Sequence, residues 1–333
     1  MGIQKILLSK QIYKFFSDYL PHQKNVSINT IKSYRDCFKL FFIFMNTKFN
    51  IKPSQLTIND LTKDNIIIFL DWLEMERHCS FRTRNQRLAA IRSFFHYSQF
   101  DVPEYLCEIQ AINAIPLKKG VRKEISYIDE TSMKILLSKT KHNGKNSLRD
   151  SAMLSLLYDG ALRVNELIQL QWEDIRFDSE ICTLRILGKG NKYRIIPISH
   201  ETSHLLKLLK RKGNGVGIVF INSQHKKLTR KGVMYVINKY VKEAVEEYDF
   251  KNNNPITCHV FRHSKATHML NAGIPLIYIR DFLGHSSVKT TEIYAKANIV
   301  EKIKTIQNLD KKENQNMKEW NEDKELMSWL ESI

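Results

Sequence analysis

The sequence has no hydrophobic run long enough to cross a membrane. Its longest uninterrupted apolar stretches cover residues 40–45 and 66–70, whereas a transmembrane helix needs about 20 such residues. The N-terminal segment MGIQKILLSK lacks the apolar core of a signal peptide, and Ile6 stands where a myristoylation motif requires Ser or Thr. The sequence therefore indicates neither membrane insertion nor secretion nor lipid attachment.

Cysteine is scarce and follows no pattern. The five cysteines are odd in number and no two of them form a Cys-x-x-Cys pair: Cys37, Cys79, Cys107, Cys182 and Cys258. This usage argues against a disulfide framework and against a zinc cluster. It indicates reduced thiols in a cytoplasm.

Acidic residues are too few to balance the basic ones. The chain has 35 Asp and Glu against 52 Lys and Arg, a net charge of +17. Residues 1–120 carry +7 of this and residues 121–300 carry +12, whereas residues 301–333 carry −2. Such a balance predicts a polyanionic partner, nucleic acid first and an acidic membrane surface second. Two basic blocks suit a protein that clamps DNA between two domains, and the acidic tail is expected to contact protein.

A length of 333 residues fits about two domains, and a hydrophobic content of 43% excludes an intrinsically disordered chain. In residues 1–110, apolar side chains recur at helical spacing in four segments, which predicts a four-helix domain. Residues 111–124, AINAIPLKKGVRKE, have Pro116, Gly120 and a basic cluster but no periodicity. We expect an interdomain linker there.

Residues 125–298 are expected to form a mixed α/β domain. Segments 181–187 and 193–199 read as strands around the turn GKGNK, a hairpin signal. Helices are expected at 129–140, 147–158, 164–170, 201–212, 230–248, 259–271, 275–283 and 287–295, and two more in a tail of residues 299–333. The predicted fold class is therefore mainly α with a small β-sheet.

Four short segments contain candidate catalytic residues: GALRVNEL (160–167), LGKGNKYR (187–194), HVFRHS (259–264) and LGHSSVKTTEIYAK (283–296). Each has a structural explanation when taken alone. Arg163 and Glu166 could be a surface helix pair, and Lys189 could belong to an ordinary hairpin turn. His259 and His263, four residues apart on a helix, could bind a metal. His285 could end a helix, and Tyr294 could be a half-buried core aromatic.

Taken together and in this order, the segments resemble the tyrosine recombinase (phage integrase) family. The pattern is Arg-x-x-Glu-Leu, a hairpin lysine, His-x-x-Arg, Leu-Gly-His and a tyrosine nine residues further on. It spans residues 124–300, and the basic helical first block is similar to the family's core-binding domain. The resemblance implies the simple two-domain type, without an arm-binding domain.

The resemblance also implies roles for these residues. Arg163 and Arg262 would hold the non-bridging oxygens of a phosphodiester, and His285 would donate a further hydrogen bond to them. Tyr294 would be the nucleophile and Lys189 the general acid. His259 would either accept the tyrosine proton or donate to the transition state, and Glu166 would orient the active-site donors. The arginines neutralise charge, so we expect no metal and no cofactor.

Further DNA contacts are expected from basic side chains near the second and fourth helices of the first block and around Thr229 in the second. These are Lys32, Arg35, Arg82, Arg84, Arg87 and Arg92, and then Lys226, Lys227, Arg230 and Lys231. The four arginines from Arg82 to Arg92 are expected on or just before the fourth helix, opposite its apolar residues. In the tail, five apolar side chains are spaced as one face of a helix: Trp320, Leu326, Met327, Trp329 and Leu330. We expect them to pack on a neighbouring protomer, with folding back onto the same domain as the alternative.

The sequence thus predicts a site-specific DNA recombinase that acts as a tetramer on paired double-stranded sites. Integration, excision and dimer resolution all fit. Three alternatives stay open: a type IB topoisomerase, a DNA-binding protein of the same fold that does not cut, and a metal-dependent nuclease that uses His259 and His263.

Overall fold

The computed structural model describes residues 8–120, 126–141, 144, 146–178, 181–188, 193–213, 215–247, 255–285 and 287–297, with residues 328, 331 and 332 in the tail. The chain divides into two compact units, Met1–Arg122 and Lys123–Ile333. Each unit has its own hydrophobic core. The division falls within the segment that the sequence suggests as a linker.

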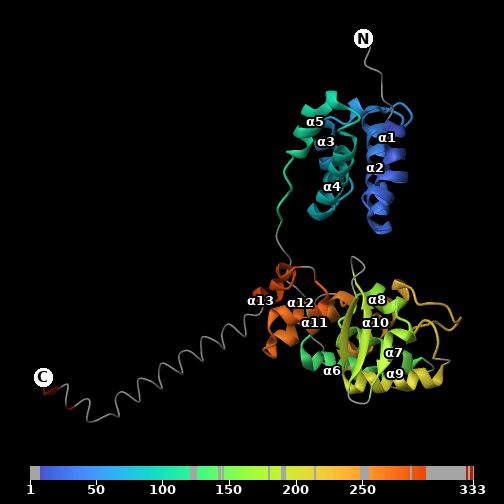
Figure 1. Cartoon of the computed structure of the whole chain (residues 1–333), viewed down its shortest axis with the longest axis vertical. Helices are drawn as coiled ribbons and strands as arrows, with labels where there is room; N and C mark the ends of the chain where they lie inside the picture. The colour runs from blue at the N-terminus through green and yellow to red at the C-terminus, as the bar shows by residue number, and fades with distance from the viewer. Residues whose placement is uncertain are drawn as a thin grey trace. The chain divides into compact units, whose positions relative to one another are not determined.

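The first unit is a helical bundle (Figure 1). Its described residues form α1 (Leu8–Lys14), the π-helical segment η1 (Phe15–Gln23), α2 (Ile28–Phe49), α3 (Lys63–Met75), α4 (Phe81–Ser98) and α5 (Leu106–Asn113), with short 3-10 turns at Ile58–Asp60 (η2) and Pro103–Tyr105 (η3). Side-chain oxygens of Ser27, Thr62 and Ser80 accept backbone N–H groups at the starts of α2, α3 and α4. These caps satisfy donors that a helix start leaves unpaired. The starts of α3 and α4 agree with the sequence, which suggests Thr62 and Ser80, whereas α2 begins after Ser27 and not after Asn29 or Thr30 as its sequence suggests.

Aromatic rings fill the core of this bundle. Phe15 is fully buried and meets Phe94 edge to face with ring centroids 5.4 Å apart, and Phe41 meets Phe69 in the same way at 5.3 Å. These contacts join η1 to α4 and α2 to α3. Edge-to-face pairs add to the stabilisation from area burial alone.

The first unit extends further than the sequence predicts, because a fifth helix covers its end. Ile109, Ile112 and Ile115 are almost completely buried in the same core. The main-chain carbonyls of Ile115 and Pro116 also accept hydrogen bonds from arginines of α4. The first residues of the expected linker therefore belong to the bundle, because their apolar side chains are buried in its core.

The second unit surrounds a small antiparallel sheet with helices (Figure 1). The described elements are α6 (Glu130–Lys139), α7 (Ser147–Asp159), α8 (Val164–Gln169), η4 (Trp172–Asp174), β1 (Ile175–Phe177), β2 (Cys182–Leu187), β3 (Tyr193–Ile198), α9 (His200–Lys212), α10 (Arg230–Glu247), α11 (Cys258–Asn271), α12 (Leu276–Leu283), η5 (Val288–Thr290) and α13 (Glu292–Ala297). The fold class, mainly α with one small sheet, is confirmed.

The hairpin predicted around the glycine-rich turn is also present. Strands β2 and β3 pair in antiparallel register from Cys182 opposite Ile198 to Leu187 opposite Tyr193. The strand β1, which pairs with β2 on the other side, was not expected. It has three residues, too few for a period-two pattern to stand out from the sequence.

A third, smaller apolar cluster lies where α11, α12 and α13 meet. Ala266, Ile279, Leu283 and Tyr294 are buried in it, together with Ala161 from the turn before α8. This cluster matters for function because it brings residues around Leu-Gly-His and the candidate nucleophile against α11.

All five cysteines are free thiols, and burial raises the pKa of Cys37 to about 12 and that of Cys258 to about 11. Within the described ranges, no helix combines the length and the apolarity that a membrane span needs.

Candidate active site

The turn before α8 places Arg163 at the N-cap position of the helix, and Glu166 folds back onto it. The Arg163 backbone N–H donates to Glu166 Oε2 at 2.8 Å, and its Nη1 donates to Oε1 at 2.9 Å. The Glu166 side chain is 6% exposed, whereas that of Arg163 is 32% exposed. The pair is therefore not a surface ion pair. Glu166 is buried, and it holds the partly exposed guanidinium of Arg163 in place.

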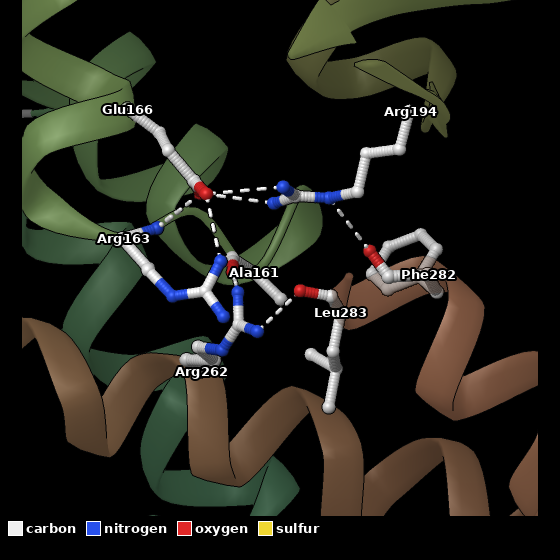
Figure 2. A network of polar contacts seen from close by, with 7 residues as sticks. All are labelled: Ala161, Arg163, Glu166, Arg194, Arg262, Phe282 and Leu283. Carbon is white, nitrogen blue, oxygen red and sulfur yellow. Dashed lines mark hydrogen bonds and ion pairs between the residues drawn. The ribbon is translucent and has the colours of Figure 1, made fainter. Parts of the chain in front are cut away.

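A second arginine, Arg194 of β3, completes this brace. Its Nη1 and Nη2 donate to Glu166 Oε1 and Oε2 at 3.0 and 2.9 Å, and its Nε donates to the Phe282 carbonyl at 3.1 Å (Figure 2). Burial raises the pKa of the Glu166 carboxyl, but the hydrogen bonds and charges of Arg194 and Arg163 outweigh this and hold the pKa below its ordinary value. Glu166 is therefore an ionised bridge between α8, β3 and the end of α12.

Arg194 was not among the predicted site residues, although it ends the segment LGKGNKYR. Strand alternation in the sequence does not single it out, because both faces of β3 carry apolar residues, and only the structure shows which face is buried. Arg194 lies one position from Tyr193 and Ile195, which are 62% and 72% exposed, so its side chain points to the other, buried face. An arginine on the inner face of a strand needs a charged partner.

Arg262 is fixed in a different way, by two main-chain carbonyls. Its Nη1 donates to the Ala161 carbonyl at 2.7 Å and its Nη2 donates to the Leu283 carbonyl (Figure 2). Ala161 has a left-handed backbone, with φ +45°, which is costly for a non-glycine residue. Burial, and then the positive charge of Arg163, lowers the pKa of Arg262 to about 9, so the group stays charged at neutral pH.

The Leu-Gly-His segment needs glycine for two reasons. Gly284 ends α12 with φ +64°, a conformation that other residues rarely adopt. A Cβ atom at this position would also lie 2.9 Å from Arg194 Cδ. Gly284 therefore lets α12 end against Arg194, and the chain continues directly into His285.

His285 lies half-buried beside the arginines. Its Nδ1 is joined to Thr291 Oγ1 by a hydrogen bond of 3.1 Å. Burial lowers the pKa of His285 to about 4, and the charges of Arg262, Arg163 and Arg194 add to the effect. The imidazole is therefore neutral near pH 7.

Tyr294 on α13 is 1% exposed and contacts α11. Its hydroxyl is joined to His263 Nδ1 by a hydrogen bond of 2.9 Å. Burial raises the pKa of the Tyr294 phenol above its ordinary value, although the charges of Arg262 and Arg163 act in the opposite direction. The candidate nucleophile is thus a neutral phenol within the field of both arginines.

The two histidines of α11 lie one turn apart but in different surroundings. His259 is exposed, whereas His263 is half-buried, and their ring centroids are 6.4 Å apart. His263 Nδ1 is hydrogen-bonded to the Tyr294 hydroxyl, so this nitrogen is already occupied. No group of three or more metal-ligating side chains occurs among the residues that the structure describes.

The predicted general acid, Lys189, lies outside the described residues, which include the hairpin up to Gly188 and again from Tyr193.

In the first unit, the basic residues expected to contact DNA separate into two groups. Lys32, Arg35 and Arg82 are exposed. Arg84 was expected opposite the apolar residues of α4, and this was wrong: it is 4% exposed, lies 3.4 Å from Glu74 and donates to the Pro116 carbonyl. A buried guanidinium must be paired inside the protein, which leaves this one turned away from a surface ligand.

Arg87 and Arg92, half-buried on the same helix, also have internal acceptors. Arg87 Nη1 donates to the Ser33 carbonyl of α2 at 2.8 Å, and Arg92 Nη2 donates to the Ile115 carbonyl. These two side chains link α4 to α2 and to the segment after α5. Their charge is only partly available to a ligand.

In the second unit, the four basic residues near Thr229 are all exposed: Lys226, Lys227, Arg230 and Lys231. Arg230 begins α10, and its Nε donates to Asn165 Oδ1 of α8 at 2.7 Å. This basic patch therefore borders the helix that carries Glu166.

The apolar tail residues that were predicted to contact a neighbouring protomer lie outside the described residues: Trp320, Leu326, Met327, Trp329 and Leu330.

Two family models match the chain, one in each unit. Residues 126–300 match the phage integrase family, and residues 14–99 match the phage integrase N-terminal SAM-like domain. The chain is 31% identical over 306 residues to tyrosine recombinase XerC of Roseiflexus castenholzii, covering 87% of this chain and 90% of XerC. It is 30% identical over 287 residues to tyrosine recombinase XerD of Listeria monocytogenes, covering 84% and 91%.

Solved structures share the fold. XerH site-specific recombinase bound to palindromic difH substrate matches with a TM-score of 0.65 at 19% identity, covering 93% of this chain and 92% of that one. The Tn1549 transposon integrase in complex with circular intermediate DNA matches with a TM-score of 0.65 at 16% identity, covering 87% and 95%. With the braced arginines, the buried tyrosine and the relatives in agreement, the chain belongs to the phage integrase family and is a tyrosine site-specific recombinase.

Proposed function

We propose that this recombinase binds double-stranded DNA and exchanges strands between two sites through a 3′-phosphotyrosyl intermediate. The observation that carries the proposal is the assembly of Arg163, Arg262, His285 and Tyr294 around one corner of the second unit. Each is held by a named partner: Glu166, two carbonyls, Thr291 and His263 respectively. A site held in this way before substrate arrives is suited to electrostatic catalysis.

Arg163 receives the scissile phosphate, and Arg262, which is 3% exposed and held by two carbonyls, acts on it through its charge. Arg163 is bound by Glu166 on one side but remains 32% exposed, so its guanidinium can donate to a non-bridging oxygen. Arg262, held by its two carbonyl partners, contributes a fixed positive charge, and neutral His285 contributes a hydrogen-bond donor. Together they stabilise the charge that accumulates on a five-coordinate phosphorus.

Tyr294 attacks phosphorus, and the 5′ oxygen leaves. The bond from the phenol oxygen to phosphorus forms as the bond from phosphorus to the 5′ oxygen breaks, which leaves a 3′-phosphotyrosyl link and a free 5′-hydroxyl. Lys189 donates the proton that the leaving oxygen needs. Exposed His259 either accepts the phenol proton itself, or donates a hydrogen bond to the phosphate while water accepts the phenol proton. The energy of the phosphodiester is retained in the adduct, so religation to another strand needs no ATP.

Basic surfaces on both units hold the duplex. In the second unit these are Lys226, Lys227, Arg230 and Lys231, next to α8, and in the first unit Lys32, Arg35 and Arg82. Phosphate contacts of this kind position the protein without reading sequence. We expect four protomers to bring two sites together and to exchange strands in pairs through a Holliday junction, with the apolar face of the tail binding a neighbouring protomer. Integration or excision of a mobile element and the resolution of DNA dimers all use this reaction.

A two-site plasmid tests this function. The plasmid carries two copies of the DNA that flanks the gene for this protein, and the reaction is run with EDTA. The proposal predicts ligated recombinants, with a Holliday junction as a transient product. Relaxation of a plasmid without the flanking DNA, and no recombinants, would instead favour a topoisomerase. Tight binding with no strand exchange and no covalent adduct would favour a protein that does not cut.

A further inference from the structure

The histidine nearest to the nucleophile is the one to which neither the sequence pattern nor the proposed mechanism gives a task. His263 Nδ1 lies 2.9 Å from the Tyr294 hydroxyl oxygen, and the two ring centroids are 5.6 Å apart. Tyr294 belongs to α13 and His263 to α11, and these helices pack together around Ala266 and Leu283. The hydrogen bond therefore joins two separate elements at the reacting atom.

The spacing on α11 separates the tasks of its two histidines. His259 and His263 are four residues apart and so lie on one face of the helix, but His259 is exposed and His263 is half-buried. Arg262, between them, turns inward to the Ala161 and Leu283 carbonyls. His259 is thus placed to contact substrate, and His263 lies behind it against the tyrosine.

Burial makes this hydrogen bond consequential. Tyr294 is 1% exposed, and a buried phenol hydroxyl without a partner is costly. A phenol that loses its partner would turn about its side-chain bonds to find another, and small displacements of a reacting atom cost large factors in rate. Burial and the nearby His259 and Arg262 lower the pKa of His263 to about 4, so the imidazole is neutral wherever the enzyme works.

We propose that His263 is a positioning residue for the nucleophile: its Nδ1 holds the Tyr294 hydroxyl in register with Arg163, which binds the phosphate, and with the charge of Arg262. This inference rests on the proposed function, in which Tyr294 attacks the DNA. It assigns the contact with the nucleophile to His263 and leaves His259 for the substrate. The groups that face His263 are His259 and Arg262 on its own helix and Tyr294 on α13.

Three substitutions separate the hydrogen bond from simple packing. His263→Asn keeps a hydrogen-bonding atom near the place of Nδ1, His263→Gln moves it to the place of Nε2, and His263→Phe keeps the ring without the hydrogen bond. The measurement is the single-turnover rate of covalent adduct formation on a nicked duplex that carries the recombination site, with thermal stability and DNA affinity measured on the same samples. His204→Asn, at an exposed position, is the matched control.

The proposal predicts an order that packing alone does not. His263→Phe and His263→Gln should slow adduct formation about ten- to a hundredfold, because a buried hydroxyl loses its partner, while DNA affinity changes little. His263→Asn should recover most of the wild-type rate. If the Phe variant does not fold, the comparison of Asn with Gln carries the test.

Two results would overturn it: His263→Phe or His263→Gln reacting as fast as wild type or faster, or His263→Asn reacting as slowly as His263→Gln. A failure of the proposed function is distinct from both. In that case the wild-type protein forms no adduct, or the adduct survives Tyr294→Phe.

Discussion

Arg194 donates hydrogen bonds from Nη1 and Nη2 to the two carboxylate oxygens of Glu166, at 3.0 and 2.9 Å, although the two residues are 28 positions apart in the sequence. The same carboxylate holds Arg163, and Arg194 also holds the Phe282 carbonyl just before the Leu-Gly-His segment. Three of the four recognised segments are therefore tied together through a residue that contacts no substrate in the proposed mechanism. The hairpin that leads to Lys189 is connected through β3 to the arginine that binds the phosphate.

We predict that Arg194→Lys destabilises the second unit and slows catalysis. A lysine is a point charge and cannot bond both carboxylate oxygens and the Phe282 carbonyl at once. The expected cost is about 1–3 kcal/mol of stability and at least a tenfold loss in adduct formation, measured by denaturant unfolding and by single-turnover cleavage. Arg185→Lys on β2 is the control, because its side chain is 56% exposed and lies 3.4 Å from Asp174. Equal effects of the two substitutions would refute the bracing role of Arg194.

The close approach of Gly284 to Arg194 predicts a steric effect of alanine there. Gly284→Ala should cost more stability than Gly273→Ala, and only Gly284→Ala should impair cleavage. Both glycines have a positive φ, +64° and +79°, so both substitutions carry the same conformational cost, about 1 kcal/mol. A Cβ at Gly273 would meet nothing within 4 Å, whereas one at Gly284 would lie 2.9 Å from Arg194 Cδ. Thermal unfolding and cleavage assays of the two variants check this difference.

Acid should destabilise the protein through its active-site histidines. His263 and His285 have pKa values of about 4, below the ordinary value of 6.5, because burial disfavours their charged forms. The unfolded chain therefore binds more protons than the folded one, and the free energy of unfolding is highest above pH 6.5 and falls as the pH drops towards 4. Each imidazole contributes about 1–2 kcal/mol to this loss, less than the full shift would give, because both side chains are partly exposed to solvent.

Unfolding midpoints of the whole chain at pH 7, 5.5 and 4.5 measure it, with His285→Asn as the comparison. That variant should lose less stability than wild type between pH 7 and 4.5. Identical pH dependence in both would show that His285 does not contribute.

Salt dependence should distinguish exposed cations from buried ones. Lys231→Gln removes one phosphate contact from the patch at the start of α10 and should reduce the slope of log affinity against log salt by about 1. Arg84→Gln should leave the slope unchanged and lower the thermal stability of the first unit, because Arg84 is paired with Glu74 and Pro116 inside it. A reduced slope with Arg84→Gln would return this residue to the DNA-contacting group.

The sequence predicts the helices and strands better than it predicts which side chains meet. Apolar periodicity located most helices and the hairpin, since those signals depend on neighbours three, four or two positions apart. The positions of Arg163, Arg262, His285 and Tyr294 followed from a pattern of residue types in fixed order. Which side of α4 Arg84 faces depends instead on α3 and on the segment after α5, and nothing local in the sequence records that.

The partners of the catalytic residues were equally beyond local reasoning. Arg194 meets Glu166 across 28 residues, and His263 meets Tyr294 across 31. His263 was visible only as a possible metal ligand beside His259, because helix spacing places the two on one face and reveals nothing of α13.

Covalent joining of Tyr294 to DNA is the step on which the proposed function depends. The most direct measurement looks for adducts that resist SDS on supercoiled plasmid carrying the DNA that flanks the gene, in EDTA, with wild type, Tyr294→Phe and Tyr278→Phe. Tyr278 is 64% exposed on α12 and serves as the control tyrosine. We predict an adduct at one locus, blocked at its 3′ end, with wild type and Tyr278→Phe and none with Tyr294→Phe. An adduct that persists in Tyr294→Phe would contradict the account.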